Sequence, residues 1–143
     1  MKEKLNKQLR SDEGAEPCVY KDSLGYYTIG VGRLVDSRKG GGLSQEEISY
    51  LLNNDIANKS EALFAAIPWI VTLPEPVQGA LVNMAFQLGV NGLLGFKTTL
   101  GLLKDLKFEE AATQMLKSKW ATQTPNRAKR VAEQVRTQSW IYS

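Results

Sequence analysis

The chain has 143 residues, the length of about one domain. Of these residues 43% are hydrophobic and 23% are charged, which is an ordinary composition for a globular protein. It has no histidine and one cysteine, which excludes Ser–His triads, histidine-ligated metal sites and an internal disulfide. The net charge is +3, and residues 73–143 hold nine Lys and Arg against five Asp and Glu, which indicates either an anionic partner or a solvated helix face.

The first predicted element is a short helix over residues 2–12. Leu5 and Leu9 lie one helical turn apart among polar residues, and Gly14 is suited to end the helix just after Glu13. Glu13 is therefore expected at a helix C-terminus.

A strand pattern follows, from Pro17 to Leu34. The segment from Asp22 to Gly25 predicts a tight turn, with these two residues at the first and fourth positions of type I. In the second strand Thr28 alternates with glycines on one face, where a ligand would be able to lie directly on the backbone.

A long helix is predicted after a polar, glycine-rich loop over residues 35–43. Ser44 and Glu47 have the spacing of a capping box, and apolar residues recur behind them at helical intervals. The helix should cover residues 45–65, about 30 Å at a rise of about 1.5 Å per residue.

The rest of the chain is helical in pattern. Pro76 can open a helix that Gly89 stops, and Trp120 and Trp140 are expected to anchor the core near segment ends. The remaining helical segments are predicted over residues 93–96, 98–106, 108–117 and 127–136.

Two carboxylates are candidates for chemistry. The carbonyl dipoles at a helix C-terminus should raise the pKa of Glu13, whereas Asp22, in a wet turn, should stay ionised. An acid and a carboxylate with separated pKa values form the pattern of glycoside hydrolysis, and Thr28 across the hairpin is able to hold a water. Spacing alone, however, favours purely structural roles for both acids.

A family resemblance changes that balance. The strings "DEG", "YKDSLGYYTIGVGRLV", "ALVNMAFQLG", "GLLGF", "EEAA" and "KSKWATQTPNRAKRV" occur in this order and cover nearly the whole chain. They resemble the T4-type phage lysozymes of glycoside hydrolase family 24. The resemblance implies an enzyme that cleaves the β-1,4 bond between N-acetylmuramic acid and N-acetylglucosamine in peptidoglycan, with no metal or organic cofactor.

The same resemblance implies roles for individual residues. Glu13 takes the position of the general acid, Asp22 that of the second carboxylate, and Thr28 that of the threonine that helps to hold the attacking water. The positions that contact substrate correspond to Leu34, Phe86, Thr99 and Gln114. Gln114 replaces an asparagine of the family, and the connection from Arg33 to Ser44 is shorter than in the family.

The implied fold is α+β, a single lysozyme domain over residues 1–143 with two lobes. A small antiparallel sheet lobe would cover about residues 13–43, and the helix over residues 45–65 would link it to the second lobe. That larger, all-helical lobe would comprise residues 66–143 together with the N-terminal helix, and the substrate cleft would lie between the lobes.

The expected partner is the glycan strand of peptidoglycan, bound by a monomer with no nucleic acid and no membrane insertion. No apolar run approaches the roughly 18 residues of a membrane span, and the start "MKEKLNKQLR" is too polar for a signal peptide. An enzyme of this kind would wait in the host cytoplasm until a holin opens the inner membrane. The alternatives are a non-catalytic wall-binding module and, from basic charge alone, a nucleic-acid-binding helical domain.

Overall fold

The computed structural model describes residues 2–21, 23–30, 33–34 and 42–142, with the backbone only at residues 12, 13, 16–18 and 33. The chain divides into two compact units, Met1–Leu52 and Asn53–Ser143. We call them the N-terminal unit and the C-terminal unit and describe each by itself. The expected grouping of the N-terminal helix with the helical lobe stays a prediction.

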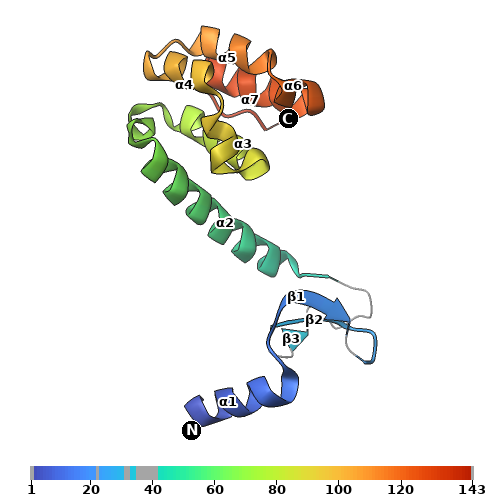
Figure 1. Ribbon diagram of the computed structural model, residues 1–143. Coiled ribbons are helices and arrows are strands. Elements are labelled where there is room, and N and C mark those ends of the chain that lie inside the picture. Colours follow the sequence, from blue (N-terminus) through green and yellow to red (C-terminus); the bar gives the residue numbers. More distant parts are fainter. Residues whose placement is uncertain (1, 22, 31–32, 35–41, 143) are drawn as a thin grey trace. The chain divides into compact units, whose positions relative to one another are not determined.

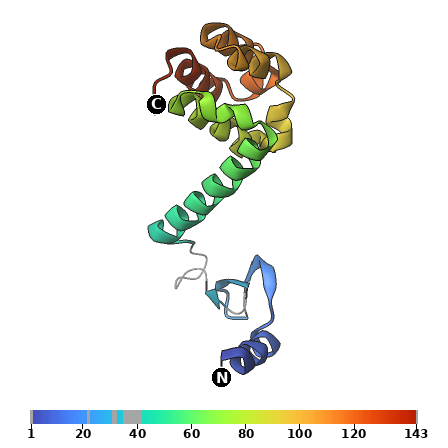
Figure 2. The ribbon, with the colours of Figure 1, turned by 90° about the vertical axis from the view of Figure 1, so that its left-hand side faces the viewer.

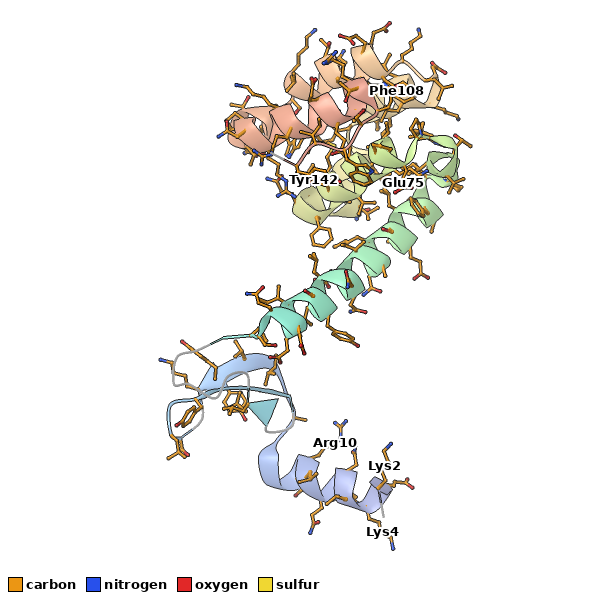
Figure 3. All side chains as sticks on the ribbon, turned by 180° about the vertical axis from the view of Figure 1, so that it is seen from behind. Lys2, Lys4, Arg10, Glu75, Phe108 and Tyr142 are labelled. Carbon is orange, nitrogen blue, oxygen red and sulfur yellow. The ribbon has the colours of Figure 1, made fainter. Side chains whose placement is uncertain are left out.

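The N-terminal unit begins with α1 (Lys2–Glu13). Its side chains are mostly polar, and Lys2, Lys4 and Arg10 project outward from it (Figure 3). The helix ends where the sequence predicts, because Gly14 adopts a φ of +78° and donates its backbone N–H to the carbonyl of Arg10 at 3.0 Å.

A three-stranded antiparallel sheet follows, in the order β1 (Glu16–Lys21), β2 (Tyr27–Gly30), β3 (Arg33–Leu34). The register pairs Tyr20 of β1 with Thr28 of β2, and Thr28 in turn with Leu34 of β3. The predicted turn between β1 and β2 starts at Asp22, which lies outside the described residues. So does most of the glycine-rich loop over residues 35–43.

The long helix is α2 (Gln45–Ala66), within one residue of the predicted end. Both hydrogen bonds of the predicted capping box are present. Ser44 donates its backbone N–H to the Glu47 carboxylate at 3.1 Å, and Glu47 donates its backbone N–H to the Ser44 hydroxyl, also at 3.1 Å.

The C-terminal unit consists of helices, all of which Figure 1 labels except the short 3₁₀ turn η1 (Pro68–Thr72). α5 packs against both α4 and α7, and α3 and α6 also pack against α7. Both ribbon views show α7 lying beside α5 (Figure 1, Figure 2). The helices are α3 (Glu75–Leu94), α4 (Lys97–Lys104), α5 (Phe108–Leu116), α6 (Lys119–Gln123) and α7 (Pro125–Thr137).

One hydrophobic core joins these helices. Its fully buried, large side chains come from the end of α2, from η1 and from α3, α4, α5 and α7. Burying side chains of this size contributes roughly 1.5–3 kcal/mol each, which makes this core the main source of stability in the unit. These side chains are Leu63, Ile70, Val77, Leu81, Met84, Leu93, Leu103, Met115 and Val135.

Gly89 breaks α3 as the sequence predicts. Its φ of 74° and ψ of 162° are non-helical, and the chain then resumes a helical path to Leu94. Among the described residues no single helix is long and apolar enough to cross a membrane. α3 and α4 reach that length and composition together, but they are bent by 97° at their junction.

The two tryptophans that were expected to anchor the core differ in burial. Trp120 is 3% exposed and is a core anchor as predicted, whereas Trp140 is 45% exposed, so its expected role is only partly met. The Trp140 ring lies directly on Gly79 of α3, where an added Cβ would stand 2.4 Å from the ring. A glycine at this position therefore allows the C-terminal segment to lie against α3.

A surface ion pair on α7 gives a testable pH dependence. Arg136 donates through Nε to the Glu133 carboxylate at 2.9 Å, and its Nη1 lies 3.8 Å from Glu109. The hydrogen bond from Arg136 lowers the pKa of Glu133. Because the pKa of Glu133 is lower in the folded protein than in the unfolded chain, where it is about 4.3, the ion pair adds to the free energy of unfolding above pH 4.3. This contribution is lost as the pH falls through the pKa of Glu133 in the folded protein.

We therefore expect Glu133→Gln to lower the melting temperature at pH 7, with a difference from the parent that shrinks as the pH falls below the unfolded pKa of about 4.3. Thermal unfolding followed by circular dichroism measures this difference. Glu110→Gln, on the neighbouring α5, removes an acid that has no ion pair among the described residues and serves as the control. A difference that persists unchanged at pH 2 would contradict the assignment.

Candidate active site

Glu13 is the last residue of α1, as the sequence predicts. The position follows from the local chain, because Gly14 supplies the left-handed residue that closes the helix with a bond to Arg10. The last carbonyls of a helix carry a partial negative charge that favours the neutral form of a nearby acid. The Glu13 side chain lies outside the described residues, and its role stays a prediction.

Asp22 lies outside the described residues, so its predicted role stays a prediction as well. Its chain neighbours are described: Lys21 ends β1 opposite Tyr27 of β2, and the Lys21 ammonium lies 5.5 Å from the centre of the Tyr27 ring. Gly25, at the predicted fourth position of the turn, has a φ of +87°.

Thr28 is held at the middle of the sheet. It is 4% exposed and pairs with both neighbouring strands, and its hydroxyl donates to the Tyr26 carbonyl at 3.3 Å. The hydroxyl oxygen remains able to accept a hydrogen bond. Ile29, on the opposite face, is more exposed than Thr28, so the polar side chain of this strand is the buried one.

Leu34 is brought next to Thr28 by the register of β2 and β3 and is exposed. The structure thus places one predicted catalytic residue and one predicted substrate contact on adjacent strands of a single sheet. Whether they act together on a sugar stays a prediction.

In the C-terminal unit, Thr99 and Gln114 line one hollow of about 210 Å³. Thr99 comes from the first turn of α4, and Gln114 from α5, which packs against α4. Two residues that are fifteen positions apart in the chain therefore share a site. Phe86, the remaining predicted contact, is a half-buried residue of α3 and lines none of the hollows described here.

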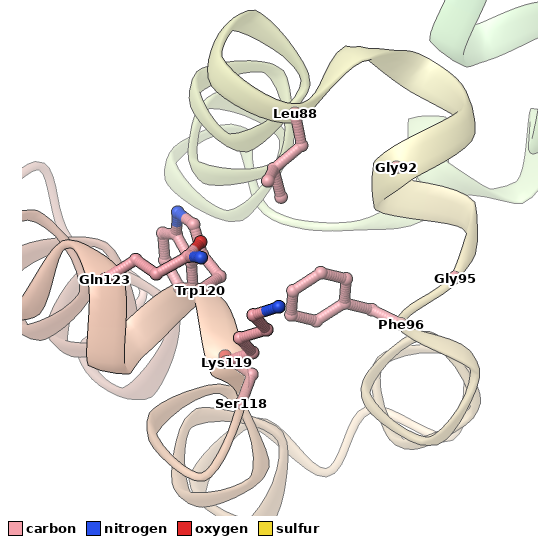
Figure 4. Close-up of a pocket in the computed structure, with 8 residues that line it drawn as sticks. All are labelled: Leu88, Gly92, Gly95, Phe96, Ser118, Lys119, Trp120 and Gln123. Carbon is pink, nitrogen blue, oxygen red and sulfur yellow. The ribbon is translucent and has the colours of Figure 1, made fainter.

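A second hollow of about 430 Å³ adjoins the first and has a mostly apolar lining (Figure 4). Trp120 and Phe96 are among its lining residues, with ring centroids 6.1 Å apart and ring planes at 83°. The Trp120 indole donates to the side chain of Gln87 at 2.8 Å, which fixes the ring. The two hollows share Gly95, Phe96 and Ser118.

Sequence reasoning missed these lining residues as site candidates. Trp120 and Gln87 are 33 positions apart, so no local pattern connects them. Trp120 is 3% exposed, so its ring presents little surface to the hollow that it lines. The described residues contain no group of three acidic or cysteine side chains placed to hold a metal ion.

Comparison of the sequence with known proteins identifies its family. Residues 10–137 match the family described as Phage lysozyme. "Probable T4-type lysozyme 1" from Dictyostelium discoideum is 36% identical over 93% of this chain and 94% of its own length. "Probable T4-type lysozyme 2" from the same organism is 32% identical over 89% of this chain and 90% of its own.

Longer phage proteins contain a similar segment. "Pre-baseplate central spike protein Gp5" of Enterobacteria phage T4 is 31% identical over 89% of this chain and 26% of its own length. The family match covers the segments that contain Glu13, Asp22, Thr28 and the two adjoining hollows. The chain therefore belongs to the phage lysozyme family, and it is a glycoside hydrolase of the lysozyme type.

Proposed function

We propose that the chain hydrolyses the β-1,4 bond between N-acetylmuramic acid and N-acetylglucosamine in peptidoglycan. The observation that carries the proposal is the family match over residues 10–137 together with the retention of Glu13, Asp22 and Thr28 within it. "Peptidoglycan hydrolase gp36" of Pseudomonas phage phiKMV, 31% identical over 94% of this chain and 16% of its own length, supports the choice of polymer.

In this proposal Glu13 is the general acid. The helix end disfavours its charged form, so that it holds a proton for the leaving oxygen of the glycosidic bond. Asp22 stays ionised and acts as the base for a water molecule. Thr28 supports that water through the lone pairs of its hydroxyl, whose proton is engaged by the Tyr26 carbonyl.

The second proposed feature is inversion of the anomeric centre. A threonine that acts together with the second carboxylate suits the holding of a water rather than the formation of a covalent sugar ester. Inverting glycosidases keep their two carboxyl groups roughly 6.5–9.5 Å apart to admit that water, against roughly 5–5.5 Å in retaining enzymes. The Glu13 and Asp22 carboxyl groups should therefore stand too far apart to hydrogen-bond.

Stereochemistry tests this mechanism directly. A β-linked oligosaccharide of peptidoglycan should first release the α-anomer, because the water attacks from the face opposite the leaving group. Proton NMR resolves the two anomeric signals before mutarotation mixes them. An initial β-anomer would overturn inversion but leave the choice of substrate intact.

We propose a monomer that acts on the cell wall, released from the host cytoplasm during phage lysis. The name of one phage relative, a peptidoglycan hydrolase, supports the cell wall as the place of action, and the basic excess of the second half suits an anionic wall polymer. A non-catalytic wall-binding module is the competing function, and retention of all three predicted catalytic residues favours the enzyme.

A further inference from the structure

Another hollow of the C-terminal unit lies where α3, α7 and the segment after α7 meet. Its volume is about 320 Å³, and it shares no lining residue with the two hollows of the candidate active site. Trp140, whose ring lies on Gly79, brings the C-terminal segment against α3 (Figure 2). The polar residues that line the hollow are Asn83, Arg127, Arg130, Gln134 and Tyr142.

Gln134 fixes the C-terminal wall of this hollow. It is 7% exposed, donates its side-chain N–H to the Pro76 carbonyl at 2.7 Å and accepts the backbone N–H of Ile141 at 3.3 Å. The chain turns at Gln138, which has a φ of 51° and donates its side-chain amide to carbonyls in the last turn of α7. The segment that carries Tyr142 is therefore tied to both α3 and α7.

Asn83 orients the Arg127 guanidinium. Arg127 donates Nε to the Asn83 side-chain oxygen at 3.0 Å and Nη2 to the Asn83 backbone carbonyl at 3.1 Å. A guanidinium has five N–H donors, so Arg127 keeps donors for a ligand beyond those that Asn83 engages. The Asn83 amide oxygen accepts from Arg127, and its NH₂ group therefore remains available as a donor.

Arg130 lies three residues further along α7 and lines the same hollow. It forms no hydrogen bond or ion pair with a described residue, and no acidic residue is among those that line the hollow. The side-chain oxygens of Asn83 and Gln134 already accept hydrogen bonds. The hollow thus combines two positive charges with a surplus of donors, which suits a ligand that only accepts hydrogen bonds.

We propose that this hollow binds a phosphate group between Arg127 and Arg130, with Asn83 and Tyr142 as further donors. A phosphate ester carries about −1.5 to −2 charges at pH 7 and three acceptor oxygens, which matches two guanidinium groups and donors from three segments of the chain. A carboxylate has a single charge and two oxygens, so it uses fewer of these donors. The phosphate comes either from solution or from a phosphorylated sugar of a cell-envelope polymer.

Titration of the isotope-labelled protein with sodium phosphate at constant ionic strength tests the site. The backbone amide NMR signals of Arg127, Arg130 and Tyr142 should shift, and Arg130→Gln should weaken binding by roughly tenfold, the loss of one charge-assisted contact. Acetate should bind at least about tenfold more weakly than phosphate. Circular dichroism checks that Arg130→Gln, a change at an exposed residue, keeps the fold.

Lys129→Gln is the matched control, because it removes the same charge from the neighbouring position of α7, which does not line the hollow. It should bind phosphate as the parent does. Equal losses for Lys129→Gln and Arg130→Gln would reduce the effect to general charge and overturn the proposal. So would acetate that binds as tightly as phosphate, or a parent protein whose signals do not respond to phosphate.

A second titration identifies the source of the phosphate and needs no hydrolysis, so its result is independent of the proposed function. The probes are N-acetylglucosamine 6-phosphate and unphosphorylated N-acetylglucosamine. Binding of the ester at least as tightly as inorganic phosphate assigns the site to a phosphorylated sugar. Binding of inorganic phosphate without the ester assigns it to free phosphate. Unphosphorylated sugar that gives the same shifts as the ester would contradict a phosphate site.

Discussion

Glu13→Gln should abolish nearly all lysis of permeabilised Gram-negative cells while the protein remains folded. Glutamine keeps the shape of the side chain but has no acidic proton for the leaving oxygen. General acid catalysis contributes roughly 10²–10⁴-fold, so the loss should lie in that range. The decrease in turbidity with time measures lysis, and circular dichroism reports the fold.

The fold should survive because backbone groups, the Gly14 N–H and the Arg10 carbonyl, close the end of α1. Glu3→Gln, in the first turn of the same helix, is the matched control and should lyse cells at the parent rate. A folded Glu13→Gln protein that clears cells at more than about a tenth of the parent rate would show that another group supplies the proton.

Trp120→Ala should cost roughly 3–5 kcal/mol of stability, the usual loss when a buried tryptophan is truncated. The side chain is 3% exposed, packs edge-to-face with Phe96 and donates its indole N–H to the side chain of Gln87. Its removal leaves a cavity between α6 and the segment that links α3 to α4. Urea unfolding at constant temperature gives the free-energy difference from the midpoint and slope.

Trp140→Ala offers the same chemical change at a site that is 45% exposed. Its loss should be smaller, because less apolar surface returns to water. If the two variants lose equal stability, or if Trp140→Ala loses more, burial is not what makes Trp120 costly to replace.

Much of the fold could be predicted because it depends on local signals. The capping box at Ser44 and Glu47 fixes the start of α2, and Gly14 and Gly89 interrupt helices through backbone conformations that glycine adopts easily. No comparable local signal predicted η1 or α6, which are five residues each. Such short elements contain too few residues for a helical periodicity to be recognised.

For the candidate site, too, local patterns predict some positions, whereas others depend on tertiary packing. The end of α1 at Glu13 and the strand at Thr28 follow from local patterns, but their catalytic roles came from a family resemblance. The shared hollow of Thr99 and Gln114, and the bond from Trp120 to Gln87, depend on how α3, α4, α5 and α6 pack. Contacts between residues that are so far apart along the chain produce no periodic pattern in a single sequence.

The bond that is cut is the most direct test of the central claim. Purified peptidoglycan is digested with the enzyme, the new reducing ends are reduced with borohydride, and the sugar alcohols are identified by mass spectrometry. Cleavage between N-acetylmuramic acid and N-acetylglucosamine predicts that the new ends are N-acetylmuramitol. New ends of N-acetylglucosaminitol, or no new reducing ends from a folded enzyme, would contradict the account.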